Sequence, residues 1–307
     1  MLLLIKYTLL YGIVLMLVAL GGMFSEHSGV INIALEGIMV VGGLAGVLVT
    51  ASMPTNMAPA LIVLAAVVAA AVCGMLYSLL LAFASINLKA DQTIGGTALN
   101  MLATAIAMIL AKNFNGSTSA KISYTNKPFL FSIGGLELSI FIPLGIVLLV
   151  VSYIVMYKTR FGLRLRACGE HPQAADSVGI NVYKMRYAGV LISGVLGGVG
   201  GLAYTLAAGS GFNSDVGGYG FLALAVMIFG NWKPLPILAA SLFFALFKVI
   251  AALNSTLTFL PKFEGVKEIS NFYQMLPYIV TMIVLIFTSK NSQAPKAEGI
   301  PYDKGSR

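Results

Sequence analysis

Residues 57–86 read MAPALIVLAAVVAAAVCGMLYSLLLAFASI, an apolar run in which no position is charged. An α-helix rises about 1.5 Å per residue, so roughly 20 apolar residues cross the ~30 Å hydrocarbon core of a bilayer. This stretch is long enough to cross as one helix. It predicts that the chain is embedded in a membrane.

The rest of the chain has the same character. Of its 307 residues, 58% are hydrophobic and only 10% are charged, whereas a soluble domain carries about 25% charged residues. We therefore predict an all-α, polytopic transmembrane helical bundle with eight or nine hydrophobic segments. The expected crossings are 3–24, 57–86, 93–112, 137–157, 186–208, 234–253 and 273–289, with two glycine-rich apolar segments at 29–50 and 217–231.

Basic residues give the orientation. Four of the five arginines border one polar loop, 158–186, and the fifth is Arg307. Because cytoplasmic loops carry an excess of Lys and Arg, we place this loop, the C-terminus, Lys89 and Lys233 in the cytoplasm. Loops 113–136, 209–216 and 254–272 are then placed outside. The predicted organisation is a single transmembrane domain, 1–290, followed by a polar cytoplasmic tail, 291–307.

The same threading leaves the N-terminal part open. If Lys6 lies inside, segment 29–50 has to enter and leave the membrane on one side, since 51–57 is placed outside. Either 29–50 is a broken, re-entrant element or the N-terminus lies outside. Non-helical backbone at membrane depth is tolerated only where protein or a water-filled cavity covers it.

The sequence contains none of the catalytic motifs that we considered. No Gly-Lys dipeptide occurs, so the chain has no Walker A phosphate loop, and no His-Glu-x-x-His or Gly-x-Ser-x-Gly motif is present. The threading puts the two histidines, His27 and His171, on opposite sides, and Cys73 and Cys168 make no disulfide framework. We expect no catalytic residue, no metal and no cofactor bound by this chain.

The polar loop reads KTRFGLRLRACGEHPQAADSVGINVYKMR. Pro172 suits a first helical position and Gly179 suits the position just past a helix end, which predicts a short helix over 172–178.

Ala174, Ala175 and Val178 are expected to share one face of that helix. A short helix with such a small-residue face could dock into a groove of a cytoplasmic partner. An ordinary solvated loop fits the same composition, so the physical argument leaves both open.

This loop resembles the coupling loop of ABC importer permeases in the branched-chain amino acid, simple sugar and nucleoside group. The matching positions are Gly162, Arg166, Ala167, Gly169, Glu170, Ala174, Ala175, Gly179 and Ile180. With Arg164 and Asp176 they form the loop that we expect to engage an ATPase. The string GVINIALEGIMVVGG, residues 29–43, is most similar to the nucleoside branch, and the likeness extends over about 20–290.

The resemblance implies a division of labour. A separate cytoplasmic ABC ATPase would use the ATP, a second and different permease chain would complete the pathway, and an extracytoplasmic solute-binding protein or lipoprotein would deliver the solute. The chain would then be a multi-pass protein of a prokaryotic plasma membrane, not an enzyme, importing a small polar solute such as a nucleoside. A sugar or branched-chain amino acid permease and an ion-gradient-driven transporter are the alternatives.

Three polar side chains in apolar segments are candidates for the translocation pathway: Asn32, Glu36 and Asn100. An ionisable group in lipid is costly, so Glu36 is expected either to face a cavity or to hold a broken helix by hydrogen bonds. The asparagines have a structural alternative as well, in helix packing.

A stripe of small residues in the run SGVLGGVGGLAY, 193–204, predicts close helix packing. Its members are Ser193, Gly194, Gly197, Gly198 and Gly201. The close neighbour could belong to this chain or to a second permease.

Overall fold

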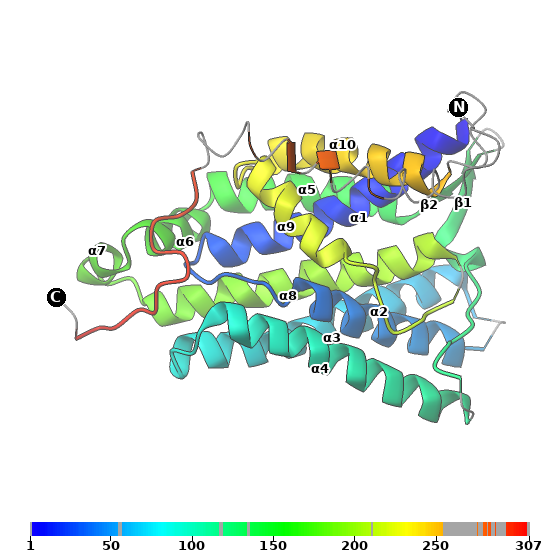
Figure 1. The fold of residues 1–307 in the computed structure, drawn as a ribbon, viewed down its shortest axis with the longest axis horizontal. Helices are drawn as coiled ribbons and strands as arrows, with labels where there is room; N and C mark the ends of the chain where they lie inside the picture. The colour runs from blue at the N-terminus through cyan, green and yellow to red at the C-terminus, as the bar shows by residue number, and fades with distance from the viewer. Residues whose placement is uncertain are drawn as a thin grey trace.

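The computed structural model describes residues 2–54, 57–116, 119–133, 136–209, 211–253 and 293–305, together with 275, 279–280, 282–283 and 286. These residues form a helical bundle with one small hairpin (Figure 1). The elements are α1 (Leu2–Glu26), α2 (Leu35–Ser52), α3 (Pro59–Ala82), η1 (Phe83–Asn87), α4 (Gln92–Asn115), η2 (Lys127–Phe129), β1 (Leu130–Ile133), β2 (Leu136–Ser139), α5 (Phe141–Lys158), α6 (Arg160–Glu170), α7 (Pro172–Ser177), α8 (Val182–Ala208), α9 (Tyr219–Phe229) and α10 (Pro234–Ala252).

The predicted all-α polytopic bundle is confirmed, but the number of crossings is corrected. In the described part of the chain, seven helices are long and apolar enough to cross a membrane, not eight or nine. They are α1, α2, α3 with η1, α4, α5, α8 and α10. The apolar segment 217–231 contains only α9, whose 11 residues are too few to cross. The expected span 273–289 falls, except for isolated positions, outside the described residues.

The two termini lie at opposite ends of the bundle (Figure 1). The C-terminus lies with α6 and α7, at what we call the tail end, and the N-terminus lies with β1 and β2, at the hairpin end. Helix α1 therefore runs from the hairpin end to the tail end. This settles the parity question: the N-terminus is on the side opposite the loop 158–186, and residues 27–34 form a non-helical break before α2.

Loops expected on one side do lie together. A β-bridge joins Ile122 to Phe212, so 113–136 and 209–216 meet at the hairpin end. The ion pair between Lys89 Nζ and Asp303 Oδ2, at 2.9 Å, places the α3–α4 turn beside the C-terminal residues at the tail end.

The expected span 137–157 began four residues too early. Residues 136–139 pair with β1 in an antiparallel hairpin whose register sets Leu130 opposite Ser139. Their sequence, LELS, alternates apolar and polar side chains, which is the period of a strand and not of a helix. Helix α5 starts only at Phe141.

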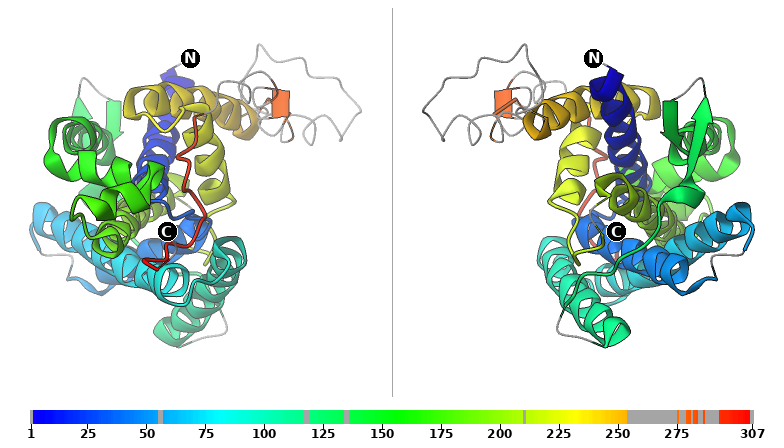
Figure 2. Two further views of the ribbon diagram at one scale, coloured as in Figure 1. Left: turned by 90° about the vertical axis from the view of Figure 1, so that its left-hand side faces the viewer. Right: turned by 90° about the vertical axis from the view of Figure 1, so that its right-hand side faces the viewer.

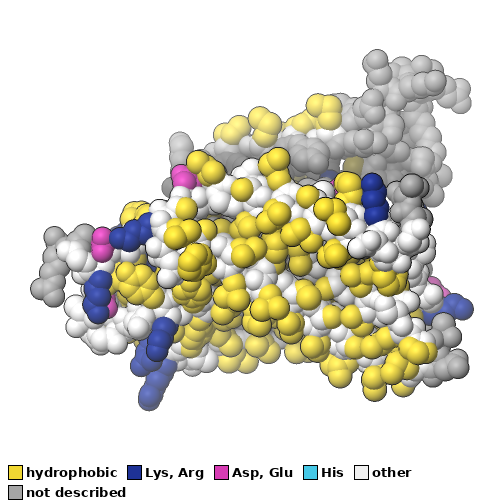
Figure 3. Space-filling model, turned by 90° about the horizontal axis from the view of Figure 1, so that it is seen from below, with side chains coloured by type: hydrophobic (Ala, Val, Ile, Leu, Met, Phe, Trp, Pro, Cys, Tyr) yellow, Lys and Arg dark blue, Asp and Glu magenta, His cyan; other side chains and the backbone are white. Residues whose placement is uncertain are grey.

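Helix α8 lies at the centre of the bundle because its small residues admit close neighbours. A Cβ added at Gly201 would lie 1.9 Å from the carbonyl oxygen of Met39 in α2, and one at Gly198 would lie 2.2 Å from that of Ala70 in α3. The close neighbours of the small-residue stripe therefore include two helices of this same chain. Away from α8 the bundle surface is apolar: Figure 3 shows hydrophobic side chains across the face seen from below, with Lys and Arg toward its ends.

Candidate functional site

Two helices begin inside the bundle, and their first turns meet. Helix α2 follows the break at 27–34, and α9 follows the non-helical segment 209–218. The carboxylate of Glu36, in the first turn of α2, accepts hydrogen bonds from the backbone N–H of Gly218 at 2.8 Å and of Gly220 at 2.6 Å. The first N–H groups of a helix have no partner within it, and a negative charge is favourable there. Glu36 therefore supplies the N-terminal cap that α9 lacks.

Asn100, on α4, performs the matching task for α2. Its Oδ1 accepts a hydrogen bond from the backbone N–H of Gly37 at 2.7 Å, and its Nδ2 donates to the carbonyl oxygen of Ile33 at 2.9 Å. One amide side chain thus satisfies a donor inside α2 and an acceptor in the break before it.

Asn32 lies in the break itself and is fully buried. Its Nδ2 donates to Ser193 Oγ at 2.8 Å, while its Oδ1 has no partner among the described residues. All three pathway candidates, Asn32, Glu36 and Asn100, therefore gather at the break. The contacts seen are those of the structural alternative, and a role toward the solute stays a prediction.

The loop 158–186 folds into two helices, of which sequence reasoning found only the second. Helix α6 begins at Arg160, where the Thr159 hydroxyl accepts from the N–H of Gly162 at 3.2 Å. A Cβ on Gly162 would lie 2.3 Å from the carbonyl oxygen of Met156, so α6 folds back tightly on the end of α5.

Gly169, near the end of α6, rests on the first residue of the break. A Cβ there would lie 2.3 Å from the carbonyl oxygen of His27. The prediction that His27 and His171 lie on opposite sides is therefore wrong, since His27 contacts α6 two residues before His171. The cause is the course of α1, which ends at the tail end and not at the hairpin end.

The short helix predicted at 172–178 is present as α7, Pro172–Ser177. The prediction that Ala174, Ala175 and Val178 share one face of this helix is wrong. Ala175 is 3% exposed and packs against Cys168, Val182 and Tyr302, whereas Val178 is 75% exposed. Ala174 and Val178, one turn apart, face outward together. Of the other loop residues, Arg164, Glu170 and Gly179 are exposed, Arg166 and Asp176 are partly buried, and Gly162 and Gly169 are buried.

Residues 293–305, expected as a polar tail, cross the tail end as a docked strap. The N–H of Ala297 donates to the carbonyl oxygen of Gly169 at 2.8 Å, and that of Gly299 donates to the carbonyl oxygen of Gly29 at 3.3 Å. The buried Arg186 donates from Nη1 to the carbonyl oxygen of Ile300 at 2.9 Å. Gly29 has φ +95°, and a Cβ there would lie 2.8 Å from Arg186 Nη2, so only glycine fits.

A buried polar cluster lies beneath the strap. Trp232 Nε1 donates to Glu26 Oε2 at 2.6 Å, and the carboxyl groups of Glu26 and Glu298 lie close enough to interact. Burial raises the pKa of Glu298 to about 7 and lowers the pKa of His27, whose Nε2 lies 3.0 Å from the Trp232 carbonyl oxygen. Sequence reasoning missed this cluster because its members are far apart along the chain.

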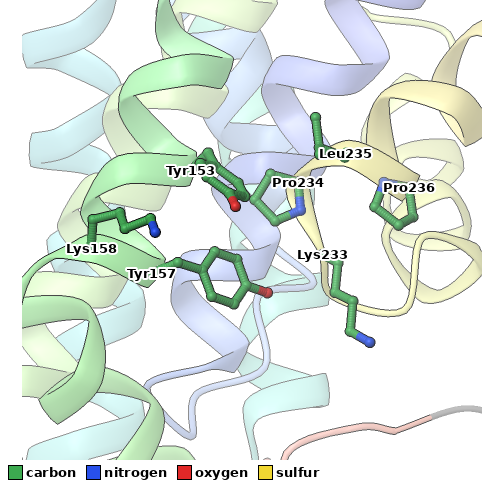
Figure 4. A pocket seen from close by; sticks show the side chains of 7 residues that line it. All are labelled: Tyr153, Tyr157, Lys158, Lys233, Pro234, Leu235 and Pro236. Carbon is green, nitrogen blue, oxygen red and sulfur yellow. The ribbon is translucent and has the colours of Figure 1, made fainter.

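A pocket of about 320 Å³ opens between α5 and α10 at the tail end (Figure 4). It is lined by Tyr153, Tyr157, Lys158, Lys233, Pro234, Leu235 and Pro236. The Arg166 guanidinium lies 4.9 Å from the centre of the Tyr157 ring, so α6 borders this pocket. Among the residues described, no group of His, Cys, Asp or Glu side chains could hold a metal ion.

Comparison with known proteins identifies the family. The family model described as "Branched-chain amino acid transport system / permease component" matches residues 4–288. The "Nucleoside ABC transporter permease protein NupC" of Lactococcus lactis subsp. cremoris is 43% identical over 96% of this chain and 95% of that protein. The "Guanosine ABC transporter permease protein NupQ" of Bacillus subtilis is 42% identical over 98% and 96%. The "Nucleoside ABC transporter permease protein NupB" of the same Lactococcus strain is 32% identical over 35% of this chain and 30% of its own length. This chain belongs to the branched-chain amino acid transport system permease family.

Proposed function

We propose that this chain is a permease subunit of an ATP-driven importer for nucleosides. The observation that carries the proposal is its similarity, over nearly the full length of both chains, to permeases named for nucleoside and guanosine transport. The chain is the membrane part: a cytoplasmic ATPase uses the ATP, and a binding protein or lipoprotein outside delivers the solute.

The second permease is a different chain. NupC and NupB of Lactococcus are both named as nucleoside permease proteins, and the match to NupC covers 96% of this chain whereas the match to NupB covers 35%. We therefore place a NupB-like chain opposite this one, with the solute crossing between them. In this arrangement the tail end, which carries the arginine-rich loop, faces the cytoplasm.

The contacts support a mechanical route from the ATPase to the interior of the membrane. The outward face of α7, with Ala174 and Val178, is free to dock on a partner. Gly169 of α6 packs directly against the backbone of His27, the first residue of the break before α2. Displacing α6 would move this break and, with it, the Glu36 carboxylate that holds α9. Nucleotide can shift the equilibrium between the inward-facing and outward-facing states only if the importer binds it with different affinities in the two states.

Uptake of radiolabelled nucleosides, with ribose and leucine as controls, tests the proposal in cells with and without this gene. Deletion should abolish nucleoside uptake alone, and the uptake should follow cellular ATP and survive an uncoupler while ATP is maintained. Loss of a control solute instead would overturn the nucleoside assignment. Uptake that collapses with the ion gradient at constant ATP would overturn the ATP-driven mechanism.

A further inference from the structure

Three tyrosine rings from three helices meet beside the junction of α2 and α9. The ring centres of Tyr204 on α8 and Tyr219 on α9 are 4.5 Å apart, and Tyr11 on α1 lies 5.6 Å from Tyr219 and 6.4 Å from Tyr204. Lys248 Nζ, from α10, lies 5.3 Å from the Tyr219 ring centre. Glu36 holds the start of α9 and so fixes Tyr219 in this group. Helix α1 packs against α8, α9 and α10, and Figure 2 (right) shows this group viewed from the hairpin end.

The hydroxyl groups of Tyr11 and Tyr204 are placed differently from those of Tyr77 and Tyr124. Tyr77 donates its hydroxyl proton to Leu99, and Tyr124 donates to Thr205, both onto backbone carbonyls. Tyr11 and Tyr204 are only half-buried, and neither hydroxyl is hydrogen-bonded to another residue in the part of the chain that the structure describes. A tyrosine that only fills a core normally finds a partner for its hydroxyl.

The position of Tyr11 and Tyr204 within membrane-spanning helices indicates what their exposed hydroxyl groups face. A hydroxyl without a partner is costly in hydrocarbon, so two such groups beside a carboxylate and a lysine have to face a polar space. The start of α9 borders open space, because a Cβ added at Gly218 would meet no atom within 4 Å. Tyr204 lies in the last turn of α8, which ends at the hairpin end. The space is therefore reached from that end, the outer end in the proposed orientation.

We infer that Tyr11 and Tyr204, backed by the buried Tyr219, form an outward-facing site at which the flat heteroaromatic ring of the solute stacks during import. The inference rests on the proposed function and adds the recognition chemistry to it. Stacking on tyrosine tolerates any nucleobase because every base has a π-face, and Tyr hydroxyls can bond its polar edge. Glu36 is a positioning residue here, since its carboxylate is engaged by backbone N–H groups.

The test compares guanosine uptake by the complete importer carrying Tyr204→Leu, Tyr204→Phe or the control Tyr153→Leu, an exposed tyrosine of α5 outside the cluster. Losing one stacking ring should lower the initial rate at subsaturating guanosine by about 10-fold or more, within the roughly 5- to 150-fold range for one base–aromatic contact. Tyr204→Phe should keep at least half of the rate, and Tyr153→Leu should match wild type. Equal amounts of importer in the membrane, with equal amounts of co-purified ATPase, show that each variant is assembled.

A second measurement needs no variant. Photolysis of 8-azidoguanosine with the wild-type importer should label peptides carrying Tyr11, Tyr204 or Tyr219, and excess guanosine should prevent the labelling. Guanosine-protected label confined to other peptides, or Tyr204→Leu uptake equal to that of Tyr153→Leu, would overturn the stacking site while leaving the nucleoside importer intact. Absence of guanosine uptake with the wild-type chain would instead overturn the proposed function, and this inference with it.

Discussion

Replacing Glu36 with Ala should release the start of α9 inside the membrane. The carboxylate takes the N–H groups of Gly218 and Gly220 at 2.8 and 2.6 Å. A hydrogen bond to a charged group contributes about 1.5–3 kcal/mol, and the loss leaves two backbone donors unpaired. Because the site is only part-buried, we expect the lower end of the summed range, about 3 kcal/mol for Glu36→Ala. Glu36→Gln keeps one acceptor oxygen and should lose about half as much.

Unfolding by SDS titration in mixed micelles measures this loss directly. Hydrogen exchange locates it: the amides of Gly218 and Gly220 should exchange faster, while those at the centre of α8 should not change. The matched control is Glu137→Ala, since Glu137 is an exposed glutamate of β2 and should stay within about 0.5 kcal/mol of wild type. If Glu36→Ala is no less stable than Glu137→Ala and the exchange at 218–220 is unchanged, the capping role is refuted.

The remaining contacts give four further expectations. Burial raises the pKa of Glu298 to about 7 from an ordinary value near 4.5, so the docked strap binds the extra proton and docking should weaken as the pH rises through this range. Emission from the single tryptophan, Trp232, should report that transition, and Glu298→Gln should remove it. Asn100→Leu leaves an N–H and a carbonyl unpaired and should cost about 2–4 kcal/mol in the SDS titration. Gly198→Leu meets backbone at 2.2 Å and should yield no folded permease by size-exclusion chromatography, a result that a monodisperse peak would contradict. Ala174→Arg, on the exposed face of α7, should abolish co-purification of the ATPase and leave membrane insertion intact, and wild-type uptake would refute a coupling role for that face.

Hydrophobicity was enough to locate the helices, because a bilayer demands long apolar runs whatever the packing between them. The ends of α3, α4, α8 and α10 lie within about four residues of the expected bounds. The loop pattern also located α7 through Pro172 and Gly179. These features depend on local chemistry, and a single sequence records local chemistry well.

Contacts between distant segments were not predictable in the same way. Glu36 was recognised as costly, yet nothing in the sequence names Gly218 and Gly220 as its partners. The predicted face of α7 was wrong because Ala175 packs against Tyr302, which is more than 100 residues away in the sequence. The tyrosine cluster left no periodic signal, since each ring comes from a different helix. A tyrosine in an apolar run beside a glycine-rich break is the one clue that could have been followed.

The strap has a consequence for the order in which the protein is completed. Its hydrogen bonds join Gly299 to Gly29 and Ala297 to Gly169, so a segment synthesised after the described helices closes the surface built by the residues that follow α1 and by α6. Contacts of such sequence separation form late. A chain cut short before residue 293 would insert its helices but present an unfinished surface, with Arg186 uncovered beneath it. If the proposed ATPase docks on this surface, its binding should require the strap, and comparison of ATPase capture by chains with and without residues 293–305 at equal membrane levels tests this requirement.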